Sequence, residues 1–438
     1  MSQLGEASAS AVIEPEIIED KTIERIKVRL SVFFDGTKNN RTNTDLINQL
    51  RQEAEDSGQQ RKDTQLFKHA KNGSSYANDY TNVAKMERYI ETSSDKTYQK
   101  KMAIYIEGPG TKDKQSDKLF GYAFGMGKTG ISKKVQKGIE NSIKKIMDNK
   151  DKKTIIEKLT LDVFGFSRGA AAARYFIHQS RLSDENIKIG LDNKGCLLER
   201  IDVNFAGLYD TVSSHGISYS NDTSELKLYS IVHAENVIQL AAADEHRERF
   251  SLTNIRSARN GREIFLPGVH SDIGGSYNDG EVEQQIIYDS FDIEEAKQDR
   301  QNLIDAGWFK PEEIELIETV DYDDIGSTVQ LKINRTVKYN HYSRIPLHIM
   351  TKYARESEID ILSQLEDDES ISDKLSSVFE NIKKYIDKHE DSKAGDWHHN
   401  DPWLCELRGQ YLHFSARCEM GLWPRMEKAE RFRNQSDG

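Results

Sequence analysis

The stretch Leu161 to Arg174, LDVFGFSRGAAAAR, constrains the fold more than any other part of the chain. An apolar run ends there in the sequence G-F-S-R-G, and four alanines with high helix propensity follow. This pattern predicts a sharp strand-to-helix turn with Ser167 at its tip, because small residues on both sides let the two backbones approach closely. Gly165 and Gly169 supply those small residues. The hydroxyl of Ser167 is therefore predicted to be an exposed nucleophile at the end of a sheet.

Further apolar runs typical of buried strands recur along the first half of the chain. They lie at Ile26 to Phe34, Lys101 to Ile106, Ile201 to Leu208 and Arg262 to Leu266. Helical patterns separate them, at Thr42 to Glu53, Tyr80 to Ile90 and Ile131 to Lys153. Such alternation favours an α/β fold with a mostly parallel central sheet covered by helices. Between Leu226 and Phe250 the pattern is less regular, and it indicates a strand or loop followed by a short helix that contains Ala241 to Ala243.

Beyond Tyr277 the chain becomes more acidic and more helical in pattern, including Phe291 to Ala306 and Ile359 to Lys388. We therefore expect three regions. Residues 1–24 form a flexible arm, residues 25–280 form the catalytic core, and residues 281–438 form a helical extension or cap. The C-terminal segment of this extension is expected to dock back on the core.

Charge and composition exclude several classes of protein. The 438 residues contain 61 Lys and Arg against 73 Asp and Glu, a net charge of −12, which argues against general binding to nucleic acid. The acidic N-terminal sequence lacks the basic start and apolar core of a secretory signal, and no run approaches the ~20 apolar residues of a membrane span. We expect synthesis in the cytoplasm and any export by a route that reads no such signal. The cysteines Cys196, Cys405 and Cys418 are expected to be free thiols.

Ser167 needs a histidine to take its proton and a carboxylate to orient that histidine. His270 follows a predicted strand closely and lies among glycines, which places it on a loop at the active edge of the sheet. Asp210 ends another predicted strand, so all three side chains are expected to converge. Asp210 follows Ser167 by 43 residues and His270 follows Asp210 by 60, which is the order of an α/β-hydrolase. His413 is a weaker rival for the role of the base.

The tetrahedral intermediate of acyl transfer also needs donors for its oxyanion. The backbone N–H of Arg168 is the first by geometry. Gly36 or Thr37 is expected to supply the second, because their loop follows the first predicted strand. Asp35 and Asp272 are alternative carboxylates. We assign them to the substrate-binding or loop-shaping surface, since Asp35 precedes the serine and Asp272 lies only two residues from His270.

Three other patterns have simpler interpretations. Gly127-Lys128-Thr129 resembles part of a phosphate-binding loop, but Tyr122 stands where the motif needs glycine, so a glycine-rich loop near the site is favoured. The basic amphipathic stretch Ile131 to Lys153 suits either a membrane surface or a helix packed on the sheet, and we favour the latter. The cluster Trp397 to Asp401 resembles a metal site only in composition, so we expect no metal and no cofactor.

Six motifs occur in order along the chain. They are FFDGT at Phe33 to Thr37, GPGT at Gly108 to Thr111, GFSRGAAAAR at Gly165 to Arg174, LYDTV at Leu208 to Val212, PGVHSDIGGSY at Pro267 to Tyr277 and YSRIPL at Tyr342 to Leu347. Together they resemble the uncharacterised-domain family of α/β-hydrolases that includes the first class of type VI secretion lipase effectors. The resemblance runs from about residue 28 to about residue 420.

In that family the serine of GFSRG, the aspartate of the DTV motif and the histidine of PGxHSD form the triad, which corresponds to Ser167, Asp210 and His270. The resemblance implies phospholipase A activity on bacterial membrane lipids, delivery into a rival cell at its membrane or periplasm, a secretion spike component and a cognate immunity protein. A non-catalytic interaction protein on a hydrolase fold, a hydrolase of a non-lipid ester, and a nucleotide-dependent enzyme remain as alternatives.

Overall fold

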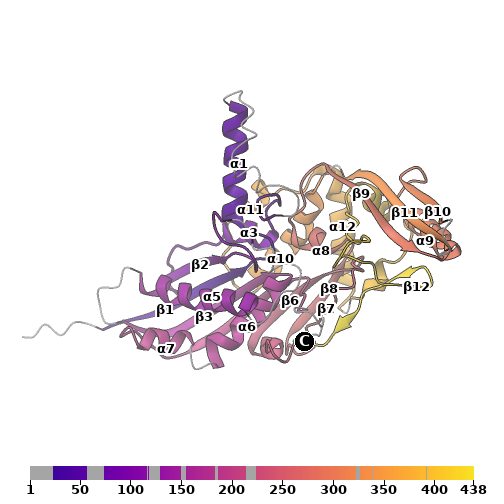
Figure 1. The fold of residues 1–438 in the computed structure, drawn as a ribbon. Coiled ribbons are helices and arrows are strands. Elements are labelled where there is room, and N and C mark those ends of the chain that lie inside the picture. Colours follow the sequence, from indigo (N-terminus) through magenta and orange to yellow (C-terminus); the bar gives the residue numbers. More distant parts are fainter. Residues whose placement is uncertain are drawn as a thin grey trace, which may run out of the picture.

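A central parallel sheet organises the fold (Figure 1). The computed structural model describes residues 23–56, 74–115, 117, 129–148, 154–182, 186–213, 223–321, 326–337, 339–390 and 392–438. The sheet has the strand order β2-β1-β3-β5-β6-β8, and the short β4 pairs with β3. Its strands are β1 (Glu24–Phe34), β2 (Lys100–Ile106), β3 (Thr154–Phe166), β4 (Leu197–Leu198), β5 (Ile201–Tyr209), β6 (Ala234–Ala242) and β8 (Gly261–Leu266). Every pairing within it is parallel, so the predicted sheet type is confirmed.

Two apolar cores lie on opposite faces of this sheet, because neighbouring residues of a buried strand point to opposite sides. Phe33 and Phe164 stack at a centroid distance of 4.5 Å in one core, whereas Phe34 and Val163 belong to the other. The helical elements on the side of Phe34 are α5 (Thr129–Met147), α6 (Arg168–Leu182), α7 (Ile187–Asp192) and η1 (Leu228–His233). Those on the side of Phe33 are α3 (Asn82–Glu87), α8 (His270–Gly274), α10 (Arg344–Glu356) and α12 (Asp373–Lys388).

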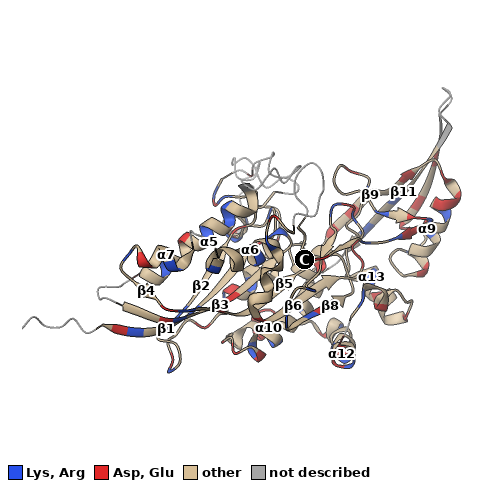
Figure 2. Cartoon of the chain, turned by 90° about the horizontal axis from the view of Figure 1, so that it is seen from below, with Lys and Arg blue, Asp and Glu red and all other residues tan. Residues whose placement is uncertain are grey.

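Helix α5 shows how the basic amphipathic stretch is used. Its apolar residues Ile131, Val135, Ile139 and Ile146 are buried in the core beside α6. Lysines mark its other face (Figure 2). Two of them, Lys134 and Lys137, bind the carboxylate of Glu107 at 2.8 and 2.6 Å. The helix is therefore packed on the sheet, as favoured from the sequence.

Strand β6 corrects the interpretation of residues 239–250. Ala241 and Ala242 belong to this strand and not to a short helix, and Ala241 pairs with Phe265 of β8. Alanine has high helix propensity, but the segment lies between β5 and β8 in the sheet, and ladder pairing on both sides outweighs that propensity.

Residues 281–438 contain helices and also a second sheet, which the prediction of a helical extension did not include. This antiparallel sheet has the order β10-β11-β9, and its strands are β9 (Glu281–Ser290), β10 (Ile314–Asp321) and β11 (Gly326–Val337). It projects from the body together with α9 (Ile293–Asp305) (Figures 1 and 2). Exposed and buried positions are mixed along β9, so its charged side chains obscured the strand pattern.

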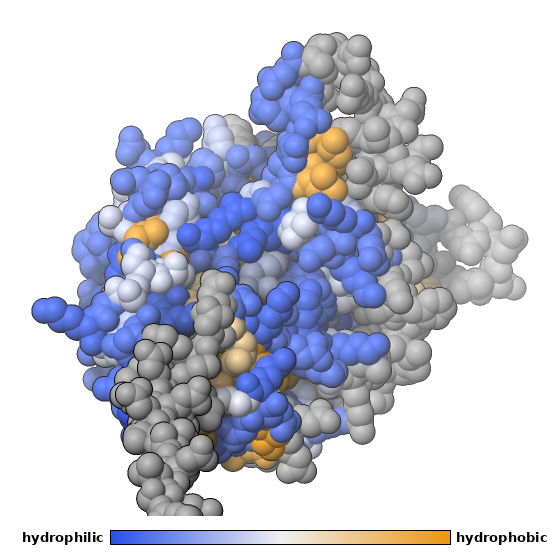
Figure 3. Space-filling model, turned by 90° about the vertical axis from the view of Figure 1, so that its left-hand side faces the viewer, coloured by the Kyte–Doolittle hydropathy of each residue, from blue (hydrophilic) through white to orange (hydrophobic). Residues whose placement is uncertain are grey.

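The remaining elements connect and cover these layers. They are α1 (Arg41–Asp56), η2 (His341–Ser343), α11 (Gln364–Asp368), η3 (Ala394–Trp397), α13 (Pro402–Gln410), β7 (Leu252–Thr253), β12 (Met426–Glu427), β13 (Glu430–Arg431) and β14 (Gln435–Ser436). Strand β14 pairs in parallel with β7, close to the carboxyl edge of the main sheet. One face of the molecule is largely hydrophilic with small separate apolar patches (Figure 3). Among the described helices, none is long and apolar enough to cross a membrane.

Candidate active site

Ser167 lies at the turn between β3 and α6 with a left-handed backbone, φ +60°. The residues two positions before and two positions after Ser167 must be glycines. A Cβ at Gly165 would stand 2.5 Å from the Cα of Ala170, and one at Gly169 would stand 2.3 Å from the backbone oxygen of Asp35. The G-x-S-x-G sequence therefore folds into a tight strand-to-helix turn because only glycine fits on either side of the serine.

Asp210 follows β5, the strand that pairs with β3. The two turns are bonded to each other, since the N–H of Ser167 donates to the carbonyl of Tyr209 at 2.9 Å and the N–H of Val212 donates to the carbonyl of Ser167 at 3.3 Å. The N–H of Ala242, at the end of β6, donates to the Asp210 carboxylate at 2.9 Å. Ser167 and Asp210 are thereby held at one edge of the sheet.

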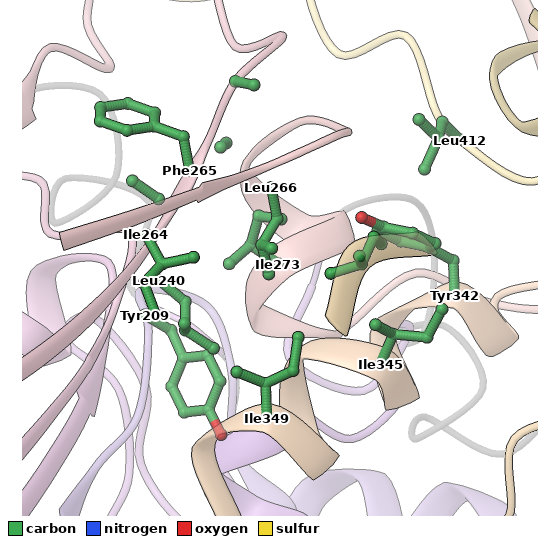
Figure 4. Packing of buried hydrophobic residues seen from close by; sticks show 14 of the residues in the cluster. Tyr209, Leu240, Ile264, Phe265, Leu266, Ile273, Tyr342, Ile345, Ile349 and Leu412 are labelled. Atoms are coloured by element: carbon green, nitrogen blue, oxygen red, sulfur yellow. The ribbon is translucent and has the colours of Figure 1, made fainter. Parts of the chain in front are cut away.

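His270 comes to the same edge from β8. It is the first residue of the short helix α8, where the sequence predicted a loop. Ile273 of this helix is buried against α10 and the ends of β6 and β8 (Figure 4). The motif YSRIPL adds a second anchor, because the hydroxyl of Tyr342 donates to the carbonyl of Pro267 at 2.6 Å. The loop that carries His270 is consequently fixed from both sides.

The imidazole of His270 binds the carboxylate of Asp210 through Nδ1, with 2.5 Å between Nδ1 and Oδ2. The rings of Phe166 and Phe250 flank it at centroid distances of 4.6 and 5.0 Å. With the proton of a neutral imidazole on Nδ1, Nε2 is left as the basic nitrogen. The structure therefore brings Asp210 and His270 together as a pair next to the residue that precedes Ser167.

Burial lowers the pKa of His270 below its ordinary value, and the contact with Asp210 opposes this shift without cancelling it. For Asp210, burial by itself raises the pKa. The charge of Arg433 and the bond from His270 more than offset that effect, so the net pKa of Asp210 is lowered. At neutral pH the pair therefore consists of a neutral imidazole and an ionised carboxylate, which is the state that a general base needs.

Sequence reasoning missed three charged residues that surround this pair. Arg433 binds both carboxylate oxygens of Asp210, at 2.7 and 2.8 Å. Glu245 accepts the backbone N–H of His270 at 3.3 Å and forms a buried ion pair with Arg247 at 2.7 Å. These residues lie in segments without a recognisable motif, and Arg433 is 223 positions from Asp210, so no local pattern signals their role.

The predicted oxyanion donors differ in their availability. The N–H of Arg168 stands in the first turn of α6, where backbone donors have no acceptor within the helix. The N–H of Gly36 is engaged, because it donates to the carboxylate of Asp35 at 2.7 Å. The hydroxyl of Thr37 is buried and has no hydrogen-bond partner among the described residues. Of the two alternatives after β1, the N–H of Gly36 is therefore engaged, and the hydroxyl of Thr37 is not engaged by a described residue.

Asp35 and Asp272 are both buried and bound to protein groups. Asp35 accepts from the hydroxyls of Thr81 and Tyr105 as well as from Gly36, and burial raises its pKa to about 6 against these bonds. Asp272 accepts the N–H of Val269 at 3.0 Å and both the N–H and Nδ1 of His413, at 3.1 and 2.7 Å. These contacts shape the loops around the site. They also engage the carboxylate oxygens of Asp35 and Asp272, which were expected to bind substrate or to shape loops.

Two further expectations concern the glycine-rich loop and a metal site. Gly127 and Lys128 of the glycine-rich loop lie outside the described residues. Within the described part of the chain, no group of three or more His, Cys, Asp or Glu side chains stands close enough to hold a metal ion.

The fold and the site define the class of protein. A parallel sheet covered on both faces, a serine at a strand-to-helix turn and a His–Asp pair at the same edge are the features of an α/β-hydrolase-like protein.

Comparison with known proteins makes the assignment more specific. The family model described as "T6SS, Phospholipase effector Tle1-like, catalytic domain" matches residues 178–291, which include Asp210 and His270. A solved structure of the Tle1 effector bound to the VgrG spike from the Type 6 secretion system is similar over 98% of this chain and 99% of that chain. The sequence identity is 22% and the TM-score is 0.64. The family model thereby confirms the resemblance to the type VI secretion phospholipase effectors over residues 178–291, and the solved structure shows that the fold is shared.

A crystal structure of an uncharacterized protein from Pseudomonas aeruginosa is less similar. Its TM-score is 0.43 at 17% identity, over 85% of this chain and 52% of that one. No curated protein sequence matches the chain.

Proposed function

We propose that this chain is a serine ester hydrolase that cleaves acyl esters of glycerophospholipids, and that it acts as an antibacterial type VI secretion effector. The observation that carries the proposal is the buried contact between His270 and Asp210 at the sheet edge where Ser167 forms the turn. The similarity to the phospholipase effector family model supports the substrate class.

In the proposed reaction, Oγ of Ser167 attacks the acyl carbonyl carbon while Nε2 of His270 takes the hydroxyl proton. His270 then gives this proton to the ester oxygen as its bond to the acyl carbon breaks, and the lysophospholipid leaves. Water attacks the acyl-enzyme by the same steps, which releases the fatty acid and restores Ser167.

The charges around the site suit this sequence of steps. The ionised Asp210 stabilises the imidazolium that forms as the proton moves to His270. The N–H of Arg168 and the hydroxyl of Thr37 are the proposed donors to the oxyanion, and each such donor is worth about 100-fold to 1000-fold in rate.

The proposed partners follow from the similar proteins. The Tle1 effector is seen bound to a VgrG spike, so we expect a spike component of the secretion system to bind this chain. The antibacterial role proposed here also requires a cognate immunity protein to protect the producing cell. We expect the protein to be made in the cytoplasm, exported by the secretion system, and active at the membrane or in the periplasm of the target cell.

A product analysis tests the proposal. Purified protein is incubated with liposomes of defined phosphatidylethanolamine and phosphatidylglycerol, and free fatty acid and lysophospholipid are measured by mass spectrometry. We expect both products from the natural protein and none from Ser167→Ala, and a fluorophosphonate probe should label only the former. The acyl position follows from the lysophospholipid that accumulates.

Two outcomes would contradict the proposal. Cleavage of short-chain esters without cleavage of phospholipid would favour a hydrolase of a non-lipid ester. Absence of both turnover and labelling would favour the non-catalytic interaction protein.

A further inference from the structure

The segment that carries Arg433 is fixed by backbone hydrogen bonds beside the site. Strand β14 runs parallel to β7 with Gln435 opposite Leu252. The N–H of Leu252 donates to the carbonyl of Asn434 at 2.9 Å, and the N–H of Thr253 donates to the carbonyl of Thr211 at 2.9 Å. Thr211 directly follows Asp210. Strand β7 is therefore hydrogen-bonded both to the residue that follows Asp210 and to the residue that follows Arg433.

The guanidinium group of Arg433 uses this position for four hydrogen bonds. Nη1 and Nη2 donate to Oδ1 and Oδ2 of Asp210 at 2.7 and 2.8 Å. Nε donates to the carbonyl of Phe250 at 2.7 Å, and Nη1 also reaches the carbonyl of Ala242 at 3.4 Å. This fork-to-carboxylate geometry sets the plane of the Asp210 carboxylate, which a lysine ammonium does not do.

The ion pair supplies Asp210 with a positive charge in direct contact with both carboxylate oxygens. The side chain of Asp210 is 0% exposed and that of Arg433 is 6% exposed. His270 is neutral before the reaction, so it gives no countercharge in the resting state. A buried carboxylate without a countercharge takes up a proton, and a protonated Asp210 loses the charge that stabilises the imidazolium.

We propose that Arg433 is a positioning residue for the hydrolysis proposed above. Its guanidinium keeps Asp210 ionised and holds its carboxylate in the orientation that accepts the Nδ1–H of His270. The inference rests on the proposed function and deepens it. It assigns a part of the site to a residue that does not touch the substrate.

The charged groups that face the pair determine how its titration responds. They are Arg433 beside Asp210 and the buried ion pair of Glu245 and Arg247 beside His270. Removal of the positive charge of Arg433 makes it easier for the coupled pair to take up a proton, whether on Asp210 or on His270. The pair is then protonated at a higher pH, and the acidic limb of kcat/KM moves to higher pH.

The test compares Arg433→Ala with Arg431→Ala in the full chain. Arg431 is a matched control, because it lies two residues away and forms a buried ion pair with Asp299 at 2.7 Å, with no contact to Asp210. We expect Arg433→Ala to lower kcat for phospholipid about 100-fold, with a small change in KM and an acidic limb at higher pH. Arg431→Ala is expected to lower the unfolding temperature while its pH profile stays that of the natural protein.

Guanidinium at non-denaturing millimolar concentration is expected to restore part of the activity of Arg433→Ala. It should not raise the activity of Arg431→Ala or Asp210→Asn, with sodium chloride at equal ionic strength as reference. If Arg433→Ala does not fold, Arg433→Lys tests the inference in its place. It keeps the charge without the fork, so we expect an acidic limb near that of the natural protein and a reduced kcat.

The outcomes separate this inference from the proposed function. An inactive natural protein that no fluorophosphonate labels refutes both. If the natural protein is active, two results overturn the inference alone. In the first, the Arg433 variants keep the natural kcat and pH profile. In the second, Arg433→Ala and Arg431→Ala lose the same share of activity and guanidinium does not restore it.

Discussion

Within the described part of the chain, two pairs of histidine and aspartate are buried, and they differ in the direction in which the pKa of the imidazole is shifted. Nδ1 of His270 lies 2.5 Å from Asp210, and Nδ1 of His413 lies 2.7 Å from Asp272. Both histidines are at most 4% exposed. Yet the pKa of His270 is lowered, whereas that of His413 is raised.

The neighbours of each pair explain the difference. Burial lowers the pKa of both imidazoles. Around His413, the contact with Asp272 and the nearby carboxylates of Glu283 and Glu281 outweigh burial. Around His270, Arg247 adds to the effect of burial, and the charge of Asp210 is shared with Arg433. A His–Asp contact by itself therefore does not identify a general base. The charges that surround the pair decide its protonation.

The largest expected effect comes from exchanging the two histidines for glutamine, one at a time. His270→Gln removes the base and should lower kcat for phospholipid by about a millionfold. His413→Gln should keep kcat within about tenfold while it lowers the unfolding temperature, because its ring is buried against Tyr277 at 3.7 Å. Liposome turnover and calorimetry measure the two effects. Equal losses of turnover would show that His413 is also needed for catalysis.

The carboxylates should differ by a smaller factor. Asp210→Asn leaves the space filled but reverses the hydrogen bond to His270, and a loss of about 10⁴-fold in kcat is expected. Asp272→Asn breaks the buried pair with His413 and should cost about 3–5 kcal/mol of stability, with a minor loss in turnover of the folded fraction. Loss of lipolysis in Asp272→Asn with activity kept in Asp210→Asn would show that the roles are reversed.

Thr37 extends the comparison to the serine side of the first pair, where Phe166 lies against the imidazole of His270. Thr37→Val deletes the unpartnered hydroxyl and should lower kcat about 100-fold with little change in KM. Thr37→Ser keeps a hydroxyl and should retain most activity. Single-turnover acylation with a fluorogenic ester measures the step directly, and equal rates for both variants would exclude an oxyanion role for the hydroxyl.

The smallest effect is on the pH dependence of stability, where the two histidines act with opposite sign. His413 has a raised pKa, so its contribution is fully present below the ordinary value of 6.5 and is lost as pH rises through its folded value. His270 has a lowered pKa, so its contribution is present above 6.5 and is lost as pH falls through its folded value.

Urea unfolding of the natural protein, His413→Gln and His270→Gln across pH 5 to 9 measures these slopes. His413→Gln should lose the fall in stability above pH 6.5, and His270→Gln should lose the fall below it. The same sign for both histidines would contradict the opposite shifts of their pKa values.

The sequence was sufficient for the features that depend on neighbouring residues. The apolar run before Ser167 is strand β3, and the periodic apolar residues after Ile131 form the buried face of α5. The order of the motifs predicted which strand ends meet, because parallel strands place their carboxyl ends at one edge.

Features that depend on distant partners were not accessible in this way. Ala241 lies in a run of alanines with high helix propensity, yet it pairs with Phe265 in the sheet. The polar strand β9 is stabilised by its pairing with β11. Arg433 contacts Asp210 only in the folded protein. The sequence around Arg433 contains no pattern that distinguishes it from the other arginines of the chain. Such contacts are set by the tertiary fold and carry no periodicity.

The position of Arg433 in the chain also bears on biosynthesis. A ribosome translates the residues of the triad long before it reaches Arg433. A nascent chain that already contains Ser167, Asp210 and His270 lacks the arginine that we propose to keep Asp210 charged. If the proposed function and this role of Arg433 both hold, the hydrolytic activity of the chain stays low during translation and rises only after Arg433 has been added and has reached Asp210.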